Sequence, residues 1–290
     1  MLAELAAALA VLTAEPLRAQ ERPRLVVLCA VDQLADWVFD RVDPFFAEDG
    51  GFRRLQRQGV RFDQCEFEHA CSETGPGHAT ISTGAPASRH GIVKNSWYEP
   101  DDGKNVYCVG EPAEALADLP EGKDRGPGRL TAMTFATALK AHVPGSKVAS
   151  VSFKDRSSIL MAGPDADVAA WIERGRRMLV TNRNWVEATP AWMKQFNDSR
   201  AIDQFFGKVW DRSGPAEAYA GLVDDRPWEA VHLNGSMSRT LPQPVTGGKD
   251  GPATAYYDQL YGTPFGNTAV RLAAEAALRG MQLGQDEVPD

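Results

Sequence analysis

A glycine-rich turn around Thr74 joins a predicted strand to a predicted helix, and this unit constrains the fold more than any other feature. The apolar stretch Val60–Phe67 predicts the strand, and Pro76–Thr83 predicts the first turns of the helix. Gly75 and Gly77 permit backbone conformations that a side chain would forbid. Such a turn exposes one hydroxyl and aims helix N–H groups at an approaching anion. A nucleophilic threonine and a threonine that only caps the helix both fit this pattern.

Two further apolar runs predict buried strands of the same sheet, and each ends in charged side chains. Arg24–Val31 runs into Asp32, and Lys147–Phe153 runs into Lys154 and Arg156. Ligands of open α/β sheets bind beyond the carboxyl ends of the strands, so these side chains are placed for function. Helix capping by the aspartate and a solvated strand end for the two cations remain open. The alternation predicts an α/β fold with a mostly parallel sheet and helices on both faces.

The rest of the chain alternates less regularly. The spacing of apolar residues predicts a hairpin of Val168–Ile172 with Met178–Thr181. From about residue 165 the chain becomes rich in Trp, Pro and Gly, as in an inserted cap. Helices are predicted at 51–59, 130–141, 191–196 and 266–280. The predicted organisation is a signal-like segment (1–20), the first part of a catalytic core (21–164), a cap (165–260) and a return to the core (261–290).

The composition and the first residues of the chain limit the binding partners and the cellular location that we expect. The net charge of -8 disfavours a nucleic-acid or anionic-membrane surface, but it allows a small anionic substrate. The apolar run at 5–14 is too short to span a membrane and resembles the core of a secretory signal, although it lacks a basic start. A short soluble helix is the alternative. The four cysteines do not form a disulfide framework, although an exported chain could pair two of them. We expect a periplasmic or secreted protein, with no membrane association once the signal is removed.

The polar residues near the predicted strand ends suit phosphoryl transfer. A threonine hydroxyl is a poor nucleophile until its proton is removed, and a divalent metal held by Asp32 could activate it. Asn95, Lys154 and Arg156 offer donors for the phosphoryl oxygens. Lys154 and Arg156 are two positions apart, so on an extended chain both would point to one face. The alternatives are a turn role for Asn95 and a solvated face for the two cations.

Three sequence strings carry a resemblance to a known family. Val31-Asp-Gln33, Thr74-Gly-Pro-Gly-His-Ala-Thr-Ile-Ser-Thr-Gly84 and His90-Gly-Ile-Val-Lys-Asn95 resemble the alkaline phosphatase superfamily. The resemblance is closest to its phosphate-irrepressible, zinc-dependent periplasmic branch, which is related to the type I phosphodiesterases and nucleotide pyrophosphatases. It implies an alkaline-phosphatase-like fold and hydrolysis of small phosphate esters.

The resemblance also implies a role for each site residue. Thr74 matches the nucleophile that forms a phospho-threonine intermediate and contacts a zinc ion, and Asp32 matches a zinc ligand. Asn95 matches the asparagine that holds a phosphoryl oxygen. Lys154 and Arg156 match the Lys-x-Arg pair of the monoesterases, which favours a monoester dianion over a diester. His78 falls inside the helix after the nucleophile, so we interpret it as structural.

The sequence departs from the family in its metal ligands. The family binds two zinc ions, and its remaining ligands include an Asp-x-x-x-His motif that is absent here. We therefore expect a C-terminally truncated chain, whose fold is incomplete and whose activity belongs to a longer form. Three functions remain: a phosphomonoesterase, a phosphodiesterase or nucleotide pyrophosphatase, and an inactive phosphate-binding fragment. A sulfatase is disfavoured because Cys71-Ser-Glu-Thr-Gly75 lacks the formylglycine pattern. The oligomeric state is left open.

Overall fold

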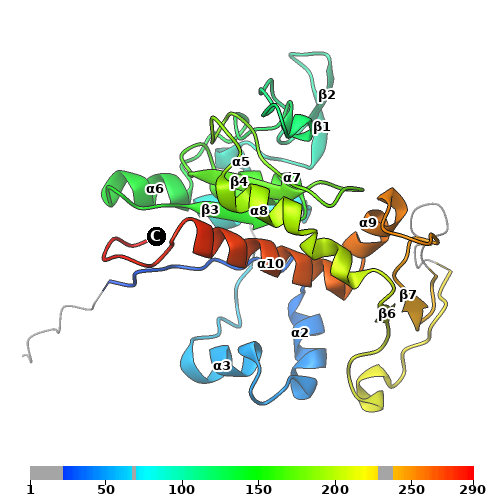
Figure 1. Ribbon diagram of the computed structural model, residues 1–290. Helices are drawn as coiled ribbons and strands as arrows, with labels where there is room; N and C mark the ends of the chain where they lie inside the picture. Colours follow the sequence, from blue (N-terminus) through cyan, green and yellow to red (C-terminus); the bar gives the residue numbers. More distant parts are fainter. Residues whose placement is uncertain (1–21, 67–69, 228–237) are drawn as a thin grey trace, which may run out of the picture.

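A computed structural model describes residues 22–66, 70–227 and 238–290 (Figure 1). The signal-like segment 1–20 lies outside this part, as does Phe67 at the end of one predicted strand. The α-helices are α2 (Asp36–Val42), α3 (Gly51–Gln58), α4 (Thr74–Thr83), α5 (Ala87–His90), α6 (Phe135–His142), α7 (Asp155–Ala162), α8 (Ala191–Ser199), α9 (Thr254–Tyr261) and α10 (Pro264–Gly280). The strands are β1 (Ser96–Glu99), β2 (Lys104–Tyr107), β3 (Ala149–Ser152), β4 (Val168–Ile172), β5 (Leu179–Val180), β6 (Val209–Trp210) and β7 (Gln243–Pro244).

A three-stranded sheet with the order β3-β4-β5 lies at the centre of the molecule. β3 and β4 are parallel, and β4 and β5 are antiparallel, with Trp171 opposite Val180. This pairing confirms the predicted hairpin, whose turn contains Gly175 at a φ of 71°. All five residues of β4 are buried. Because β4 pairs with β3, the central sheet continues past residue 165, where we expected the cap to begin. The division into core and cap stays a prediction.

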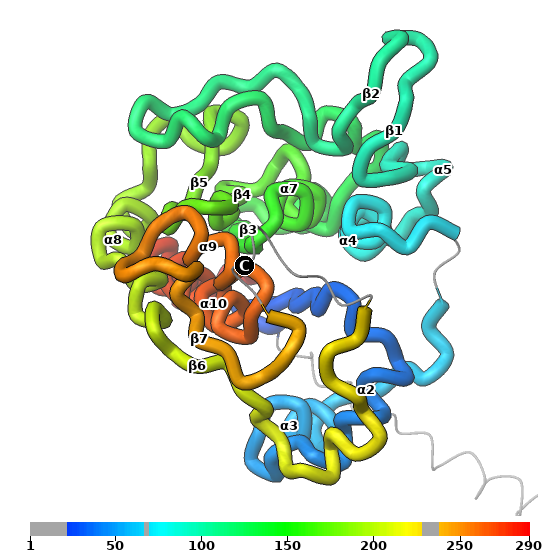
Figure 2. Tube along the Cα trace, turned by 90° about the vertical axis from the view of Figure 1, so that its right-hand side faces the viewer, coloured from blue at the N-terminus to red at the C-terminus, as the bar shows by residue number. Residues whose placement is uncertain are grey.

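Helices cover the sheet on both sides. Figure 2 shows α7 and α4 on one side of β3 and β4, and α10 and α8 on the other. Ile159 and Leu160 of α7 are fully buried. On α10, the small residues Ala269 and Ala273 are fully buried, which allows this helix to lie close to its neighbours. The arrangement gives α4, and therefore Thr74 at its start, a rigid support from α7.

The predicted helices form, with small shifts at their ends. The helix predicted at 130–141 begins only at Phe135, because the Thr134 side chain accepts a hydrogen bond from the Thr137 N–H and caps the helix there. The helix predicted from Pro76 begins two residues earlier, at Thr74. Gly84 closes it in the left-handed conformation, with a φ of 62°. No helix in the described ranges combines the length and the apolar content of a membrane span.

Two of the predicted strands do not form. Residues 24–31 are extended but belong to no sheet, and residues 60–66 also lack strand structure. Val27 is 70% exposed and Val60 is 80% exposed. A buried strand forms only where its backbone pairs with a neighbouring strand, and within the described residues no strand pairs with either of these two segments. Arg24 and Val26 instead exchange backbone hydrogen bonds with Asp290, at 2.9 Å each.

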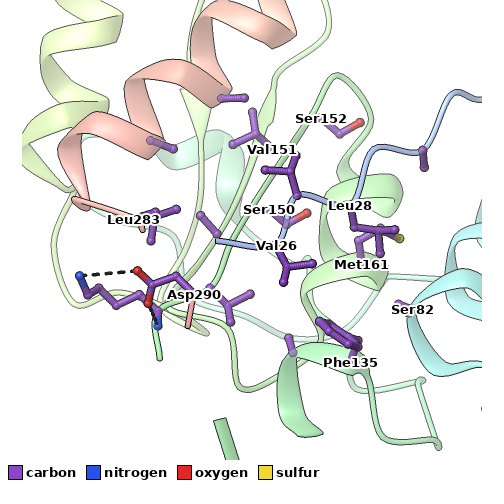
Figure 3. A pocket seen from close by; sticks show the side chains of 18 of the residues that line it. Val26, Leu28, Ser82, Phe135, Ser150, Val151, Ser152, Met161, Leu283 and Asp290 are labelled. Atoms are coloured by element: carbon purple, nitrogen blue, oxygen red, sulfur yellow. Dashed lines mark hydrogen bonds and ion pairs between the residues drawn. The ribbon is translucent and has the colours of Figure 1, made fainter. Parts of the chain in front are cut away.

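A cleft of about 260 Å³ runs along β3 beside the extended segment 25–30. Figure 3 shows Val26 and Leu28 of this segment facing the cleft, with Val151 of β3 and Met161 of α7 also on its walls. The lining is largely apolar and includes His78, but it does not include Thr74, Asn95, Lys154 or Arg156. The cleft therefore reflects loose packing of the first segment against β3, and the predicted site residues lie outside it.

Helices α2 and α3 lie apart from the central sheet (Figures 1 and 2). Neither helix has a buried residue. Phe39, Phe46 and Phe52 hold this part together, and the rings of Phe46 and Phe52 stack with centroids 4.4 Å apart. This small cluster connects Asp32 to the chain that leads into α4.

Candidate active site

Thr74 is the first residue of helix α4, where backbone N–H groups lack partners within the helix. Glu73 takes the N-cap position, but its side chain makes no capping hydrogen bond. The Thr74 residue is only 8% exposed. The sequence predicted a hydroxyl pushed into the open, and this is wrong, because other side chains of the site enclose it.

Asp32, Thr74 and Lys154 form a compact cluster. The Thr74 hydroxyl donates to Asp32 Oδ2 at 3.2 Å, and Lys154 Nζ donates to Thr74 Oγ1 at 3.2 Å. Lys154 also forms a short ion pair with Asp32. The hydroxyl therefore lies between a carboxylate that accepts its hydrogen bond and an ammonium that stabilises negative charge on its oxygen. This is a suitable environment for a nucleophilic alcohol.

Asn95, the residue before β1, contacts the start of α4. Its Oδ1 accepts a hydrogen bond from the Gly75 N–H at 2.7 Å, and its own N–H donates to Glu73 Oε2 at 2.6 Å. A Cβ on Gly75 would lie 3.1 Å from Asn95 Oδ1 and 3.2 Å from Cys108 Sγ, so the glycine permits this close approach. Among the described residues, Asn95 Nδ2 has no hydrogen-bond partner.

Arg156 is held by a network that the sequence did not reveal. Its Nη1 donates to the Tyr107 hydroxyl at 3.2 Å, and Tyr107 donates to Asp155 Oδ1 at 2.6 Å. The Asp155 carboxylate also accepts from Arg125 Nε at 2.8 Å. Arg156 Nε is buried and has no partner within the described part of the chain. An orphaned buried donor needs an acceptor, and a bound anion would supply one.

The expectation that Lys154 and Arg156 share a face of an extended chain is wrong. Lys154 is the N-cap of α7, and Arg156 lies in the first turn of this helix. Lys154 reaches Asp32 and Thr74, whereas Arg156 reaches Tyr107. The two cations therefore approach the start of α4 by different routes, and no direct contact joins Arg156 to Thr74 in the described residues.

Charge and burial shift the pKa values of two groups beside Thr74. Burial alone would raise the pKa of Asp32, but the hydrogen bond and the charge of Lys154 outweigh it and lower this pKa. Burial lowers the pKa of His78, which favours the neutral ring at pH 7. The His78 ring donates from Nδ1 to the Thr74 carbonyl at 2.8 Å, one helical turn back.

The residues present do not fit the zinc ions that the family resemblance implies. Within residues 22–66, 70–227 and 238–290, no three His, Cys, Asp or Glu side chains cluster closely enough to hold a metal ion. Zinc sites use three or four protein ligands, and here only Asp32 and Thr74 come together. Lys154 places its own positive charge against Asp32 Oδ2, the same oxygen that accepts from Thr74. We derive no chemical step through zinc.

Comparisons with known proteins agree with the fold. The family model of the type I phosphodiesterases and nucleotide pyrophosphatases matches residues 26–233. Alkaline phosphatase PafA from Elizabethkingia meningoseptica is 30% identical, and the alignment covers 96% of this chain and 51% of that protein. Alkaline phosphatase PhoV from Synechococcus elongatus is 29% identical, with 91% and 48% covered. A relative from Myroides odoratus, named a calcium-transporting ATPase, is 29% identical, with 96% and 50% covered.

Comparison with solved structures also finds alkaline phosphatases. The crystal structure of wild-type PafA superposes with a TM-score of 0.77 at 29% identity, covering 93% of this chain and 52% of that one. A PafA variant superposes with a TM-score of 0.80; its substituted positions are a threonine, an asparagine, a lysine and an arginine. The fold is that of an alkaline phosphatase. The chain belongs to the type I phosphodiesterase/nucleotide pyrophosphatase family, within the alkaline phosphatase superfamily. It spans about half the length of the curated relatives that it matches.

Sequence reasoning missed Glu73, Tyr107, Asp155 and Arg125. Glu73 and Asp155 had a weak signal, since each is an acidic residue beside a predicted site residue at a helix start. Tyr107 and Arg125 lie between the helices predicted at 76–83 and 130–141, where the sequence predicted no strand or helix. Their contacts with Asp155 span 48 and 30 residues, and no local pattern encodes such pairings.

Proposed function

We propose that this chain carries the nucleophile and the phosphate-binding residues of a phosphomonoesterase that works through a phospho-threonine intermediate. The contact of the Thr74 hydroxyl with both Asp32 and Lys154 carries the proposal. Two further observations support it. Arg156 Nε and Asn95 Nδ2 are donors without partners among the described residues, and the PafA variant is substituted at the same four residue types in the same order along its chain.

In the proposed reaction, Thr74 Oγ1 forms a bond to the phosphorus of a monoester while the ester P–O bond breaks. The hydroxyl proton passes to the departing alkoxide, which leaves as the alcohol, while the Asp32 carboxylate orients the hydroxyl through the hydrogen bond that it accepts. Water then attacks the phosphorus, the bond from Thr74 Oγ1 to phosphorus breaks, and a proton of the water returns to Oγ1 as inorganic phosphate is released. Because the pKa of Asp32 is lowered, its carboxylate orients the hydroxyl more than it removes the proton. Lys154, Arg156 and Asn95 hold the phosphoryl oxygens, and the α4 N-terminus favours their charge.

A phosphodiesterase or nucleotide pyrophosphatase is the second candidate, because the matching family model carries that description. The two cations Lys154 and Arg156 support the monoester, since a dianion gains more from two positive charges than a diester monoanion does. Hydrolysis of ATP, named for one relative, is also transfer of a phosphoryl group to water. The third candidate is a chain that binds phosphate without turnover, and the lack of a metal-binding cluster among the described residues supports it.

The test uses p-nitrophenyl phosphate and bis(p-nitrophenyl) phosphate with the intact chain, with and without added zinc. We expect acid-quenched samples to carry one phosphoryl group on the Thr74 peptide after exposure to the monoester, and none in Thr74→Ala. Faster hydrolysis of the diester would favour the second candidate. Phosphate binding without any phosphorylated Thr74 would favour the third. The absence of both binding and phosphorylation would remove the proposal.

Zinc, the substrate and the compartment stay proposals. Two zinc ions follow from the family resemblance alone, and zinc content after dialysis would measure whether this chain retains any. Small phosphate esters are the proposed substrates. A periplasmic or secreted location rests on residues 1–20, which lie outside the described residues.

A further inference from the structure

Asn95 makes two hydrogen bonds to the start of α4, one with the Glu73 side chain and one with the Gly75 backbone, and together they close a ring. The Asn95 N–H donates to Glu73 Oε2 at 2.6 Å, and the Gly75 N–H donates to Asn95 Oδ1 at 2.7 Å. Thr74 lies between the two residues that make these bonds. The ring therefore fixes the position of Asn95 relative to the nucleophile, at a sequence distance of 22 residues between the Glu73 and Asn95 partners.

The ring also fixes which end of the Asn95 amide remains able to donate a hydrogen bond. A side-chain amide has one acceptor oxygen and one donor nitrogen on opposite branches. Because Oδ1 accepts from Gly75, the donor nitrogen Nδ2 is directed away from the helix backbone. A phosphoryl oxygen can only accept hydrogen bonds, so this is the orientation that phosphate binding requires.

The Glu73 carboxylate is an unfavourable neighbour for a bound phosphate, so its place beside the proposed site calls for an explanation. A negative charge beside the nucleophile repels an anionic substrate, and the Glu73 side chain is 34% exposed, so water screens this repulsion only in part. Glu73 does not use its N-cap position to cap α4, since its side chain makes no capping hydrogen bond. Its Oε2 is committed to Asn95, and Lys94 Nζ lies 3.7 Å from Oε1, which partly neutralises the charge. The contact with Asn95 is the interaction that distinguishes this carboxylate.

We propose that Glu73 is a positioning residue: it holds the Asn95 backbone so that the Asn95 Nδ2 amide is presented to a phosphoryl oxygen bound at Thr74. This inference rests on the proposed function for the identity of the ligand. The ring itself does not depend on that function, so the two parts are tested separately.

The first measurement is a double-mutant cycle on the affinity for inorganic phosphate, determined by titration calorimetry with the intact chain. We expect Glu73→Ala and Asn95→Ala each to weaken binding about tenfold, since a hydrogen bond to a charged group contributes roughly that factor. The double variant should bind no more weakly than Asn95→Ala alone, because Glu73 acts through Asn95. Glu73→Gln keeps an acceptor oxygen and should stay within about threefold of wild type. Independent, multiplicative losses would overturn the proposal.

The second measurement is amide hydrogen exchange at Asn95 and needs no ligand. We expect Glu73→Ala to speed exchange of the Asn95 N–H, while amides of α7 stay protected. Glu99→Ala is the matched control, because Glu99 is a nearby glutamate whose carboxylate accepts from Trp97 Nε1 at 3.2 Å and contacts no site residue. Unchanged Asn95 exchange in Glu73→Ala would overturn the ring. A wild-type chain that binds no phosphate would instead overturn the proposed function.

Discussion

Lys154 forms an ion pair with Asp32 across 122 residues of sequence, and through it the end of β3 is joined to the first segment of the chain. The side chain of Lys154 is 20% exposed and that of Asp32 is 33% exposed, so water screens the pair only in part. Lys154 also donates to Thr74, which makes it the link between the carboxylate and the nucleophile. A bound phosphate would compete with Asp32 for the same ammonium.

Replacing Lys154 should weaken the binding of phosphate. We expect Lys154→Ala to lower the affinity for inorganic phosphate by about tenfold or more, because a charged donor is lost. Lys104→Ala is the control, since the side chain of this lysine on β2 is 66% exposed and pairs with Asp102 at 3.8 Å, away from Thr74. Titration calorimetry measures both. Equal affinities in the two variants would show that Lys154 does not contact the anion.

Thr74→Ser and Thr74→Ala separate chemistry from binding. The serine retains a hydroxyl between Asp32 and Lys154, so we expect phosphorylation to persist, whereas the alanine should abolish it. Both variants should bind inorganic phosphate within about threefold of wild type, because the main donors remain. Peptide mass spectrometry after acid quench detects the phosphoryl group. A phosphorylated peptide elsewhere in the alanine variant would assign the nucleophile to another residue.

Tyr107→Phe should loosen Arg156 without changing the shape of the core. The substitution removes the hydroxyl that accepts from Arg156 and donates to Asp155. We expect a loss of about 1–3 kcal/mol in the free energy of unfolding, typical of a buried polar group left without its partner. Phosphate affinity should fall with it, since Arg156 loses its orientation.

The matched control for this prediction is Tyr98→Phe. Tyr98 lies on β1 of the same hairpin and is 60% exposed, so its hydroxyl is solvated. Denaturant unfolding followed by tryptophan fluorescence compares the two variants. Similar stabilities would indicate that the Tyr107 network contributes little.

Cys108 should resist alkylation in the folded protein. It is fully buried against Gly75, and burial raises the pKa of its thiol to about 12. The thiolate is the reactive form, so little of it exists at pH 8. Cys29 and Cys65 are exposed and carry no disulfide. Iodoacetamide at pH 8 should label these two within minutes and Cys108 only after denaturation. Rapid native labelling of Cys108 would show that the packing behind Thr74 opens easily.

Local sequence patterns predicted the elements that are stabilised locally. The helix at 74–83 has glycines at its turn and at its end, and α10 follows a clear apolar periodicity up to Gly280. β3 and the β4–β5 hairpin were also recognisable from apolar runs and a glycine turn. The strands expected at 24–31 and 60–67 show the limit, because an apolar run becomes a strand only where another backbone pairs with it.

The site was predictable in its parts but not in its connections. Asp32, Thr74, Lys154 and Arg156 stand out by residue type and by position after predicted strands, and Asn95 stands out by residue type and by the string that carries the family resemblance. Two connections depend on side chains from separate elements that meet in space: Lys154 neutralises Asp32, and Tyr107 contacts Arg156. Sequence spacing carries no information about such meetings.

The extended segment 24–31 has a mechanical consequence for the site. Its backbone is tied to Asp290 near Arg24 and Val26, and no backbone hydrogen bond joins residues 27–31 to β3 in the described part of the chain. Asp32 follows this segment, and its position is therefore held by the side-chain contacts with Thr74 and Lys154 rather than by strand pairing. If a bound anion draws Lys154 away from Asp32, the segment loses one of the contacts that hold its end. Binding of an anion at the site would then be coupled to the mobility of a segment eight residues long.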